Sequence, residues 1–368
     1  MRSLIQRRRA GFTLIELMIA VLVSTIISSA LFGLFKVQSR QLMHQDQQMS
    51  MHQNLRFAAD ILSRSARMAG YGMGGEINGP MGYDYSSDST SEEYSLPAII
   101  SWDGGSSSPD AITMVYADPS LEMNTSVTTT EACSTSSLTF NMAHKNYSNL
   151  IGSYSASEMV MCWDYGASKG TESFLWQIDV AGSSSTGTIG VQDNSGFYSD
   201  YDAVCGSEEN LPPILWCSRA NVVSYYVDDD DSDGVGPGSA DHPVLMMDLN
   251  YSYPSSGQAA DDVPLVDEIE DLQIEYCPKS KDCTVESAWI DELALDDSGN
   301  YEGTTVWMVR FTIVARTQRT DLKNFGGGGT GHSKSRPAIA NRNASSAGDN
   351  YHRTITSTEI TVRNLRLL

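Results

Sequence analysis

The sequence predicts an α+β protein in which a long N-terminal α-helix packs on an antiparallel β-sheet. Three observations support this. Residues 12–35 form an apolar run without proline, and a polar stretch with helical periodicity follows it as far as residue 69. Beyond Gly70, short runs of β-branched and aromatic residues alternate with loops rich in Gly, Ser and Asp, as in sheets of short strands.

Residues 12–35 are expected to cross a membrane as a helix. Glu16 is the single charged residue between Phe12 and Lys36. At about 1.5 Å per residue, a helix of this length reaches roughly 36 Å, enough to span a bilayer. Four arginines precede the run, so the positive-inside rule places the extreme N-terminus in the cytoplasm and the rest of the chain outside.

Residues 36–69 are expected to continue this helix as an amphipathic segment. No glycine or proline occurs between Gln38 and Met68, and the break comes at Gly70 and Gly72. Apolar residues at helical spacing would form one stripe against the folded domain. The stripe contains Met51, Leu55, Ala58, Leu62 and Ala69, and Ile61 and Met68 widen it.

The remaining residues, 70–368, are expected to form a β-rich exported domain. The segment 263–276 alternates acids with Val, Ile and Leu, and is interpreted as a strand or as a short helix leading into one. The other strand candidates are 96–102, 111–117, 137–142, 158–163, 174–180, 222–227, 244–251, 306–315 and 354–362.

Charge is unevenly distributed along the chain, whose formal net charge is −22. Residues 1–70 hold nine Lys or Arg and three Asp or Glu, whereas the remainder holds fifteen basic and forty-three acidic residues. A basic, partly apolar start joined to an acidic body suggests a membrane anchor and a domain beyond the membrane. The acidic body argues against nucleic-acid binding, because it would repel phosphate.

All six cysteines lie beyond the apolar run, and an even number in an exported domain favours disulfides. No pair has the CxxC spacing of a zinc site. Proximity in sequence suggests the pairs Cys277–Cys283, Cys205–Cys217 and Cys133–Cys162.

The acidic run at residues 227–236 is the one candidate metal site. Asp229, Asp231, Asp233 and Gly234 give the D-x-D-x-D-G opening of a calcium loop. The pattern is incomplete, because the twelfth position is Ala240 instead of a glutamate and strand-like segments flank the run. The alternatives are a calcium-bound hairpin and a solvated acidic turn.

No pattern indicates catalysis, so the chain is not expected to be an enzyme. The sequence contains no GxSxG, HExxH, Walker or dinucleotide-binding motif. The six histidines are scattered, without metal-ligand spacing, at His44, His52, His144, His242, His332 and His352.

The stretch RRAGFTLIE, residues 8–16, resembles the class III signal of type IV prepilins and type II secretion pseudopilins. The resemblance implies that a prepilin peptidase removes the leader, residues 1–11, by cutting after Gly11, and methylates Phe12. It also implies an assembly role for Glu16, whose carboxylate would meet the freed amine of a neighbouring subunit. The alternative is a carboxylate that reaches the membrane surface or stays protonated without a partner.

Three C-terminal segments, 265–276, 306–317 and 358–368, resemble the closing part of PilW-like minor pilins. The resemblance implies a minor pilin that takes part in type IV pilus assembly, anchored in the inner membrane before it reaches the surface pilus. Its partners would be other minor pilins, the major pilin, the inner-membrane assembly platform and a tip adhesin. A J-type pseudopilin of type II secretion, and a pilus-delivered adhesin or ligand-binding module using residues 71–220, remain alternatives.

Overall fold

The computed structural model describes residues 12–72, 77–78, 98–126, 137–140, 159–163, 173–183, 188–191, 214–228, 242–249, 262–293, 306–318, 336–344 and 351–362. The chain divides into two compact units, Met1–Ser50 and Met51–Leu368. Helix α1 (Leu14–Met68) contributes residues to both units. Its bounds confirm the single long helix that the sequence predicts.

Helix α1 ends where glycines turn the chain back toward a strand. Gly70 and Gly72 have φ values of 78° and 80°, which glycine adopts without steric cost. The Gly70 N–H donates to Val115 O, and the Ala117 N–H donates to Tyr71 O. A Cβ atom on Gly72 would lie 2.7 Å from Ala117 Cβ, so this close approach also requires glycine. The glycines therefore join the helix directly to strand β3 (Ala111–Ala117).

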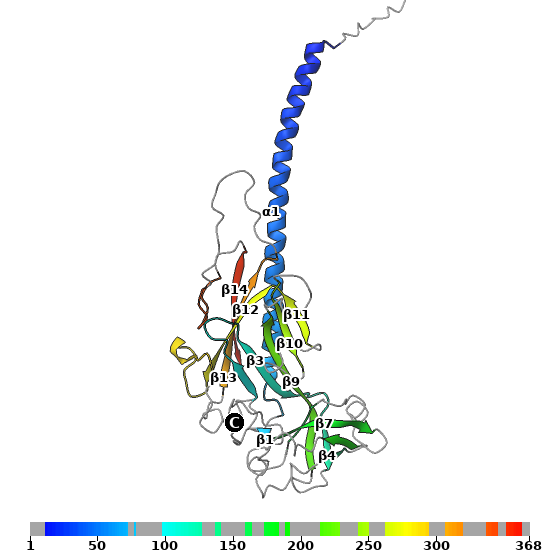
Figure 1. Cartoon of the computed structure of the whole chain (residues 1–368), viewed down its shortest axis with the longest axis vertical. Coiled ribbons are helices and arrows are strands. Elements are labelled where there is room, and N and C mark those ends of the chain that lie inside the picture. Colours follow the sequence, from blue (N-terminus) through cyan, green and yellow to red (C-terminus); the bar gives the residue numbers. More distant parts are fainter. Residues whose placement is uncertain are drawn as a thin grey trace, which may run out of the picture. The chain divides into compact units, whose positions relative to one another are not determined.

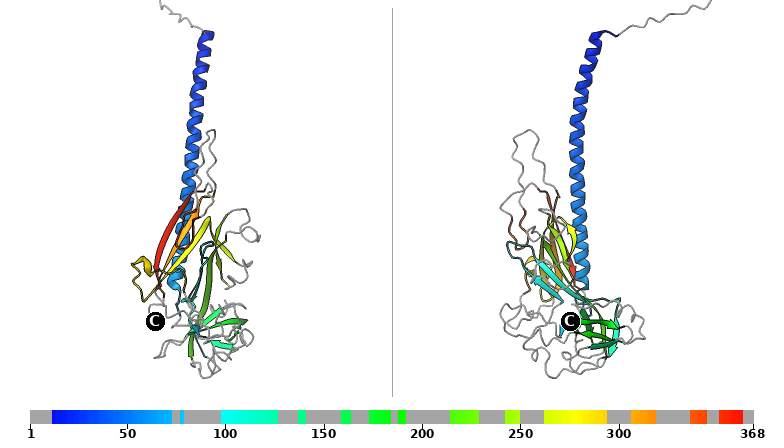
Figure 2. Two further views of the ribbon diagram at one scale, coloured as in Figure 1. Left: turned by 60° about the vertical axis from the view of Figure 1, so that its left-hand side comes forward. Right: turned by 45° about the vertical axis from the view of Figure 1, so that its right-hand side comes forward.

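Two sheets make up the described part of the Met51–Leu368 unit (Figures 1 and 2). The larger sheet has eleven strands, and its longest strand, β9 (Ile214–Asp228), pairs with β3, β4, β6 and β10. All its strand pairs are antiparallel except the pairing of β1 with β7. The other strands of this sheet are β1 (Ile77–Asn78), β2 (Ile99–Trp102), β4 (Met123–Ser126), β5 (Ser137–Phe140), β6 (Met159–Trp163), β7 (Ser173–Ser183), β8 (Thr188–Val191), β10 (Val244–Asp248) and β11 (Val263–Asp267).

The smaller sheet is antiparallel and contains β12 (Ile269–Pro278), β13 (Val306–Arg316) and β14 (Arg353–Thr361), in that order. Segment 263–276, interpreted from sequence as one strand or as a helix and a strand, is two strands, β11 and β12. Glu268 lies between them with a φ of 62°. This unusual backbone conformation lets the chain leave the larger sheet and enter the smaller one within one residue.

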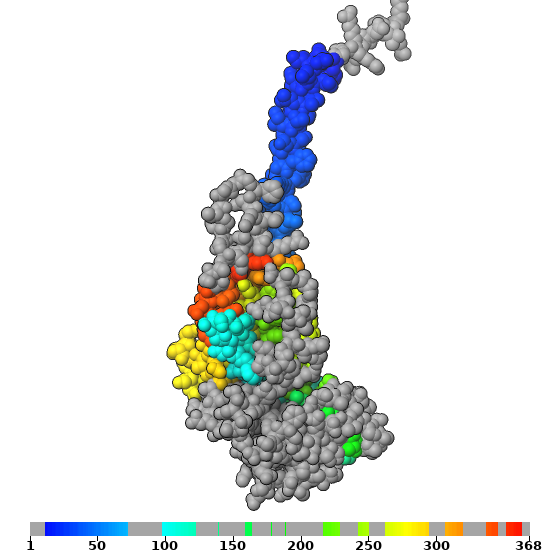
Figure 3. Space-filling view, in the orientation of Figure 1, coloured from blue at the N-terminus to red at the C-terminus, as the bar shows by residue number. Residues whose placement is uncertain are grey.

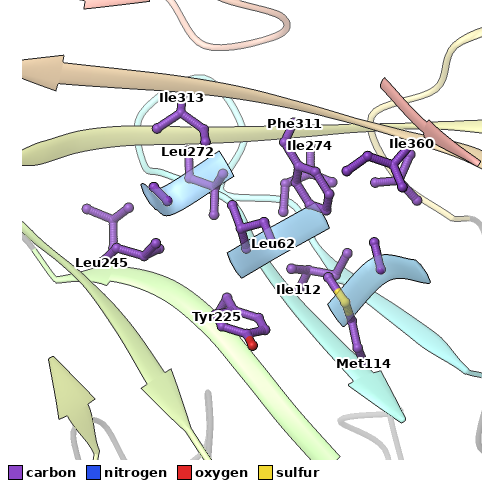
Figure 4. Packing of buried hydrophobic residues seen from close by; sticks show 14 of the residues in the cluster. Leu62, Ile112, Met114, Tyr225, Leu245, Leu272, Ile274, Phe311, Ile313 and Ile360 are labelled. Carbon is purple, nitrogen blue, oxygen red and sulfur yellow. The ribbon is translucent and has the colours of Figure 1, made fainter. Parts of the chain in front are cut away.

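The core lies between the two sheets, around the second part of α1. Figure 4 shows Leu62 with Leu272, Ile274, Phe311 and Ile313 on one side and Ile112, Tyr225 and Leu245 on the other. Met51, Leu55, Ala58, Leu62 and Ala69 are all buried, as the periodicity predicts. Ile61 and Met68 are partly buried, which agrees with their place at the margin of the stripe.

The described strands confirm each predicted strand region to within a few residues at its ends, except that β9 starts eight residues before the predicted 222. Strands β1, β4 and β8 were not predicted from the sequence, and they have two to four residues each. Segments this short contain too few residues to establish an alternating pattern.

Two disulfides lie among the described residues. Cys277–Cys283 confirms the expected short-range pair. Cys162 pairs with Cys217, so the expected pairs Cys205–Cys217 and Cys133–Cys162 are wrong. Cys162 and Cys217 are cross-strand partners of β6 and β9, 3.9 Å apart at Cα, although 55 residues separate them in sequence. Proximity in sequence fails here because neighbouring strands bring distant residues together; Cys133 and Cys205 lie outside the described residues.

We expect Leu62→Ala to lower the free energy of unfolding by about 2–5 kcal/mol, because Leu62 is fully buried between the sheets. Arg64→Ala is the control, since Arg64 lies on the exposed side with a side-chain exposure of 77%. Its change should stay within about 0.5 kcal/mol. Chemical denaturation of the full chain in detergent measures both values. Equal values for the two variants would contradict the packing of the helix between the sheets.

Candidate assembly site at the start of the helix

The first part of α1 presents an apolar surface to its surroundings. Among the described residues, the large apolar side chains from Phe12 to Phe35 are all exposed, and Phe12 itself is 88% exposed. Between Glu16 and Lys36 no charged residue interrupts this surface. The segment is long and apolar enough to cross a membrane. An apolar surface of this size requires lipid or other protein around it.

Thr13 and Glu16 form a reciprocal capping box at the start of α1. The Thr13 backbone N–H and hydroxyl both donate to Glu16 Oε2 at 3.0 Å. The Glu16 N–H donates in return to Thr13 Oγ1 at 3.3 Å. Thr-x-x-Glu is the standard spacing for this motif, because it places the glutamate at the third helical position. No role was predicted for Thr13, although the Thr-x-x-Glu spacing is the sequence signal of a capping box.

The capping box satisfies hydrogen bonds of Glu16 but supplies no opposite charge. Among the described residues, no Lys, Arg or His forms an ion pair with Glu16. A carboxylate in hydrocarbon costs about 2.5–3.5 kcal/mol on insertion scales. The arrangement therefore holds a carboxylate at a fixed place on an apolar helix, where a cationic group from another molecule can reach it.

A shallow groove with small side chains lies along one side of the same segment. Ala20, Ser24 and Ser28 recur every four residues within it, and small residues at this spacing allow another helix to approach closely. The Thr25 hydroxyl donates to Leu22 O at 2.8 Å, so it needs no partner outside the helix. The groove is lined by Leu17, Ala20, Val21, Ser24, Thr25, Ser28, Ser29 and Phe32.

Several other residues singled out by the sequence are not described by the structure. Gly11 and the acidic candidates Asp229, Asp231 and Asp233 lie outside the described residues. Asp228, the last residue of β9, is the cross-strand partner of Val244, the first residue of β10. The acidic run thus follows one antiparallel strand and precedes its neighbour, which confirms the predicted flanking strands and differs from the two helices of an EF-hand.

A buried polar cluster on the outer face of the smaller sheet was not predicted. The fully buried Asp271 carboxylate lies 2.7 Å from Arg336 Nη1 and 2.6 Å from Arg342 Nη1. Burial raises the pKa of Asp271, and the two guanidinium groups oppose that shift. Arg336 also donates to Asn343 O, and Arg342 donates to Ser107 O. The cluster fastens residues 336–344 and the 103–110 turn onto β12, so its role is structural.

Asp110 links the same turn to β12. Its carboxylate accepts the Ile274 N–H at 2.8 Å and the Gly104 N–H at 3.0 Å, and its own N–H donates to Leu272 O. Burial raises the pKa of Asp110 to about 7, although both backbone hydrogen bonds act in the opposite direction. No local sequence pattern marks this residue, because its partners on β12, Leu272 and Ile274, are more than 160 positions away.

Arg310 of β13 joins all three strands of the smaller sheet to the disulfide-closed turn. Its guanidinium lies 3.2 Å from Glu275, 3.0 Å from Glu359 and 2.8 Å from Glu286. It also stacks over the Trp289 ring at 4.1 Å from the centroid. Glu286 belongs to the short 3-10 helix η1 (Glu286–Ala288), so Arg310 holds this segment against the sheet.

Comparison with known proteins gives two family matches. Residues 6–32 match the prokaryotic N-terminal methylation motif, and residues 224–364 match the family described as Type IV Pilus-assembly protein W. A solved type IV-like pilin from Thermus thermophilus is 10% identical, with a TM-score of 0.32, and the alignment covers 85% of this chain and 97% of that one. No curated protein matches the chain.

We expect the free energy of unfolding to fall as pH rises from about 4 to about 7, because Asp110 keeps its proton to higher pH in the folded state. The folded protein binds more protons than the unfolded chain in this window, so ionisation destabilises it. Asp110→Asn should flatten the profile, by on the order of 2–4 kcal/mol across the window. Denaturation at fixed pH steps measures this; parallel wild-type and variant profiles would contradict the assignment.

Proposed function

We propose that this chain, which is a PilW-like type IV pilin, is a minor pilin that takes part in pilus assembly. The observation that carries the proposal is the capped Glu16 on an otherwise uncharged, exposed helix, within the segment that matches the methylation motif. The role is structural, with no reaction assigned to the chain. The C-terminal match to a pilus-assembly family favours a pilus over a type II secretion system.

Processing would free the group that Glu16 requires. Cleavage between Gly11 and Phe12 removes residues 1–11 and leaves a cationic amine on Phe12. In a membrane-bound subunit, Glu16 is held by Thr13. When subunits come together, the amine of a neighbour offers the carboxylate an opposite charge in a medium of low dielectric. When the Glu16 carboxylate changes its partner from Thr13 to that amine, docking is favoured and the position of one helix along the next is fixed.

The two parts of the helix would then act in different surroundings. Residues 12–35 hold the subunit in the inner membrane and later pack in the filament, where the small-residue side permits close contact between helices. Residues 36–69 connect this segment to the domain of residues 70–368. By the positive-inside rule, the basic leader would stay in the cytoplasm and that domain would lie on the periplasmic side before assembly. Prepilin peptidase, the assembly platform and other pilins are the partners that this route requires.

The alternative of a separable adhesin in residues 71–220 meets a structural difficulty. Ile99, Ile112 and Met114 belong to the same core as Leu62 of α1, so strands β2 and β3 are part of the folding unit. Removing the whole region would take these side chains out of the core. A ligand-binding surface on strands β4–β8 remains compatible with this arrangement, as an addition to the assembly role.

The first test is mass spectrometry of purified surface filaments. We expect a peptide that begins with N-methylated Phe12, in an amount well below that of the main subunit. The membrane fraction of cells without prepilin peptidase is the control, and should contain the uncut chain. Filaments that lack any peptide of this protein, while the membrane contains it, would contradict the proposal.

The second test concerns Glu16 and its cap. We expect Glu16→Ala to lower the amount of this protein in filaments by about tenfold or more, equivalent to at least roughly 1.4 kcal/mol. Thr13→Ala should produce a smaller loss and Thr13→Ser none, because serine keeps the hydroxyl that donates to Glu16. Quantitative immunoblots of filaments and membranes measure the ratio. Normal incorporation of Glu16→Ala would remove the electrostatic argument.

A further inference from the structure

The last strand of the smaller sheet has one edge that faces away from its neighbour. The Val362 N–H donates to Trp307 O at 3.0 Å, and the Thr317 N–H donates to His352 O at 2.9 Å. These bonds bracket β14, so its even-numbered residues direct their backbone groups toward β13. The odd-numbered residues direct theirs outward. Within the part of the chain that the structure describes, β13 is the one strand that pairs with β14.

This edge is accessible and almost free of charge. Ile355 is 44% exposed, and Ser357 is exposed two positions further along the same face. Figure 3 shows red atoms of this part of the chain at the surface. Arg353 and Glu359 are the charged residues of β14, and they form ion pairs with Glu270 and Arg310 inside the sheet. The five residues between them are Thr, Ile and Ser alone.

The other described strands with one pairing partner are short, interrupted or covered. Strand β12 pairs with β13 alone among the described strands, but Asp110 and Ile290 form hydrogen bonds along its other edge. Strand β11 contains Pro264, and its register with β10 shifts between Leu245 and Met246. Strands β1 and β2 have two and four residues. Proline, bulges and shortness prevent unwanted pairing at sheet edges. Strand β14 has nine residues in continuous register with β13, without proline or lysine. Its edge therefore lacks the protection that the others have.

We propose that β14 receives an extended, uncharged segment of a neighbouring subunit as a fourth strand of the smaller sheet. That the partner is another pilus subunit rests on the function proposed above. Outward N–H and C=O groups supply the affinity, and the Thr-Ile-Thr-Ser-Thr stretch selects β-branched or small side chains over charged ones. A charged residue placed there would find no free opposite charge, because Arg353 and Glu359 already pair within the sheet.

A second copy of this chain fits the edge less well. Strand β14 runs alongside the Met51–Met68 part of α1 in Figures 1 and 2. Antiparallel pairing is the commoner arrangement of strands, and it would reverse one copy end over end. The helices of the two copies would then run in opposite directions. Subunits anchored by their N-terminal helices in one membrane cannot adopt this arrangement.

Photocrosslinking in cells that assemble filaments tests the proposal with the full-length protein. The photoreactive residue p-benzoylphenylalanine replaces Ile355, and Val285, 49% exposed elsewhere in the same unit, is the control position. We expect position 355 to crosslink to an uncharged extended segment of another subunit, identified by peptide mass spectrometry, and position 285 to give no such product. Absence of a crosslink at 355, or a crosslink to β14 of a second copy, would overturn the proposal.

Ser357→Pro tests the hydrogen-bonding edge itself. The Ser357 N–H faces outward, so proline removes one edge donor while the bonds between β14 and β13 remain. Ser357→Ala is the matched control, because both variants lose the bond from Thr312 Oγ1 to Ser357 Oγ. We expect the crosslink yield at position 355 to fall about fivefold with proline and to stay near wild type with alanine.

Equal yields in the two variants would contradict strand addition. The crosslinking experiment at position 355 uses neither Ser357 variant. If the proline variant is unstable, that experiment still tests the proposal. The methylated Phe12 peptide is read separately in filaments. Its presence without a crosslink would reject the fourth strand alone, whereas its absence would reject the proposed function.

Discussion

The fold depends on one constraint, the burial of one side of α1 between two sheets. Each sheet has an apolar face, and Leu62 contacts both faces (Figure 4). A β-sheet must cover its apolar face to be stable in water. Because α1 covers the apolar faces of both sheets, removing the helix would expose both at once. Small residues such as Ala58 and Ala66 allow the sheets to approach the helix closely. The domain is therefore built around its tether, and the same helix continues into the apolar segment.

The acids of β12 fix the outer face of the smaller sheet. Asp271 binds two arginines from residues 336–344, and Glu270 pairs with Arg353 of β14. Glu268, which directly precedes β12, lies 3.4 Å from Arg316 Nε and 2.5 Å from His242 Nδ1, at the point where the chain passes between the sheets. Losing one partner of such a buried pair leaves an uncompensated charge, which costs more than the pair contributes. These contacts define where surface segments lie, while apolar packing supplies most of the stability.

Sequence reasoning identified what local spacing encodes and missed what the tertiary fold creates. The stripe from Met51 to Ala69 and the bounds of α1 follow from periodicity, which a single helix displays by itself. The disulfide Cys277–Cys283 closes a short turn, so it could also be predicted from the sequence. Cys162–Cys217 and the Asp110 contacts depend on which strands become neighbours, and no local pattern specifies that order. At the candidate site, Glu16 was predicted because it interrupts an apolar run. Thr13 was missed, although it lies three residues before Glu16, at the spacing of a capping box.

The acids of the two units differ in where their partners come from. In the Met51–Leu368 unit, the buried Asp271 carboxylate obtains two arginines from the same chain, so its charge is neutralised when the domain folds. Glu16 obtains two hydrogen bonds from Thr13 and, among the described residues, no cation. A charge left in this state on an apolar helix favours any event that brings a positive group to it. Folding brings the arginines to Asp271, whereas under the proposed function the amine of a second molecule would bring the opposite charge to Glu16.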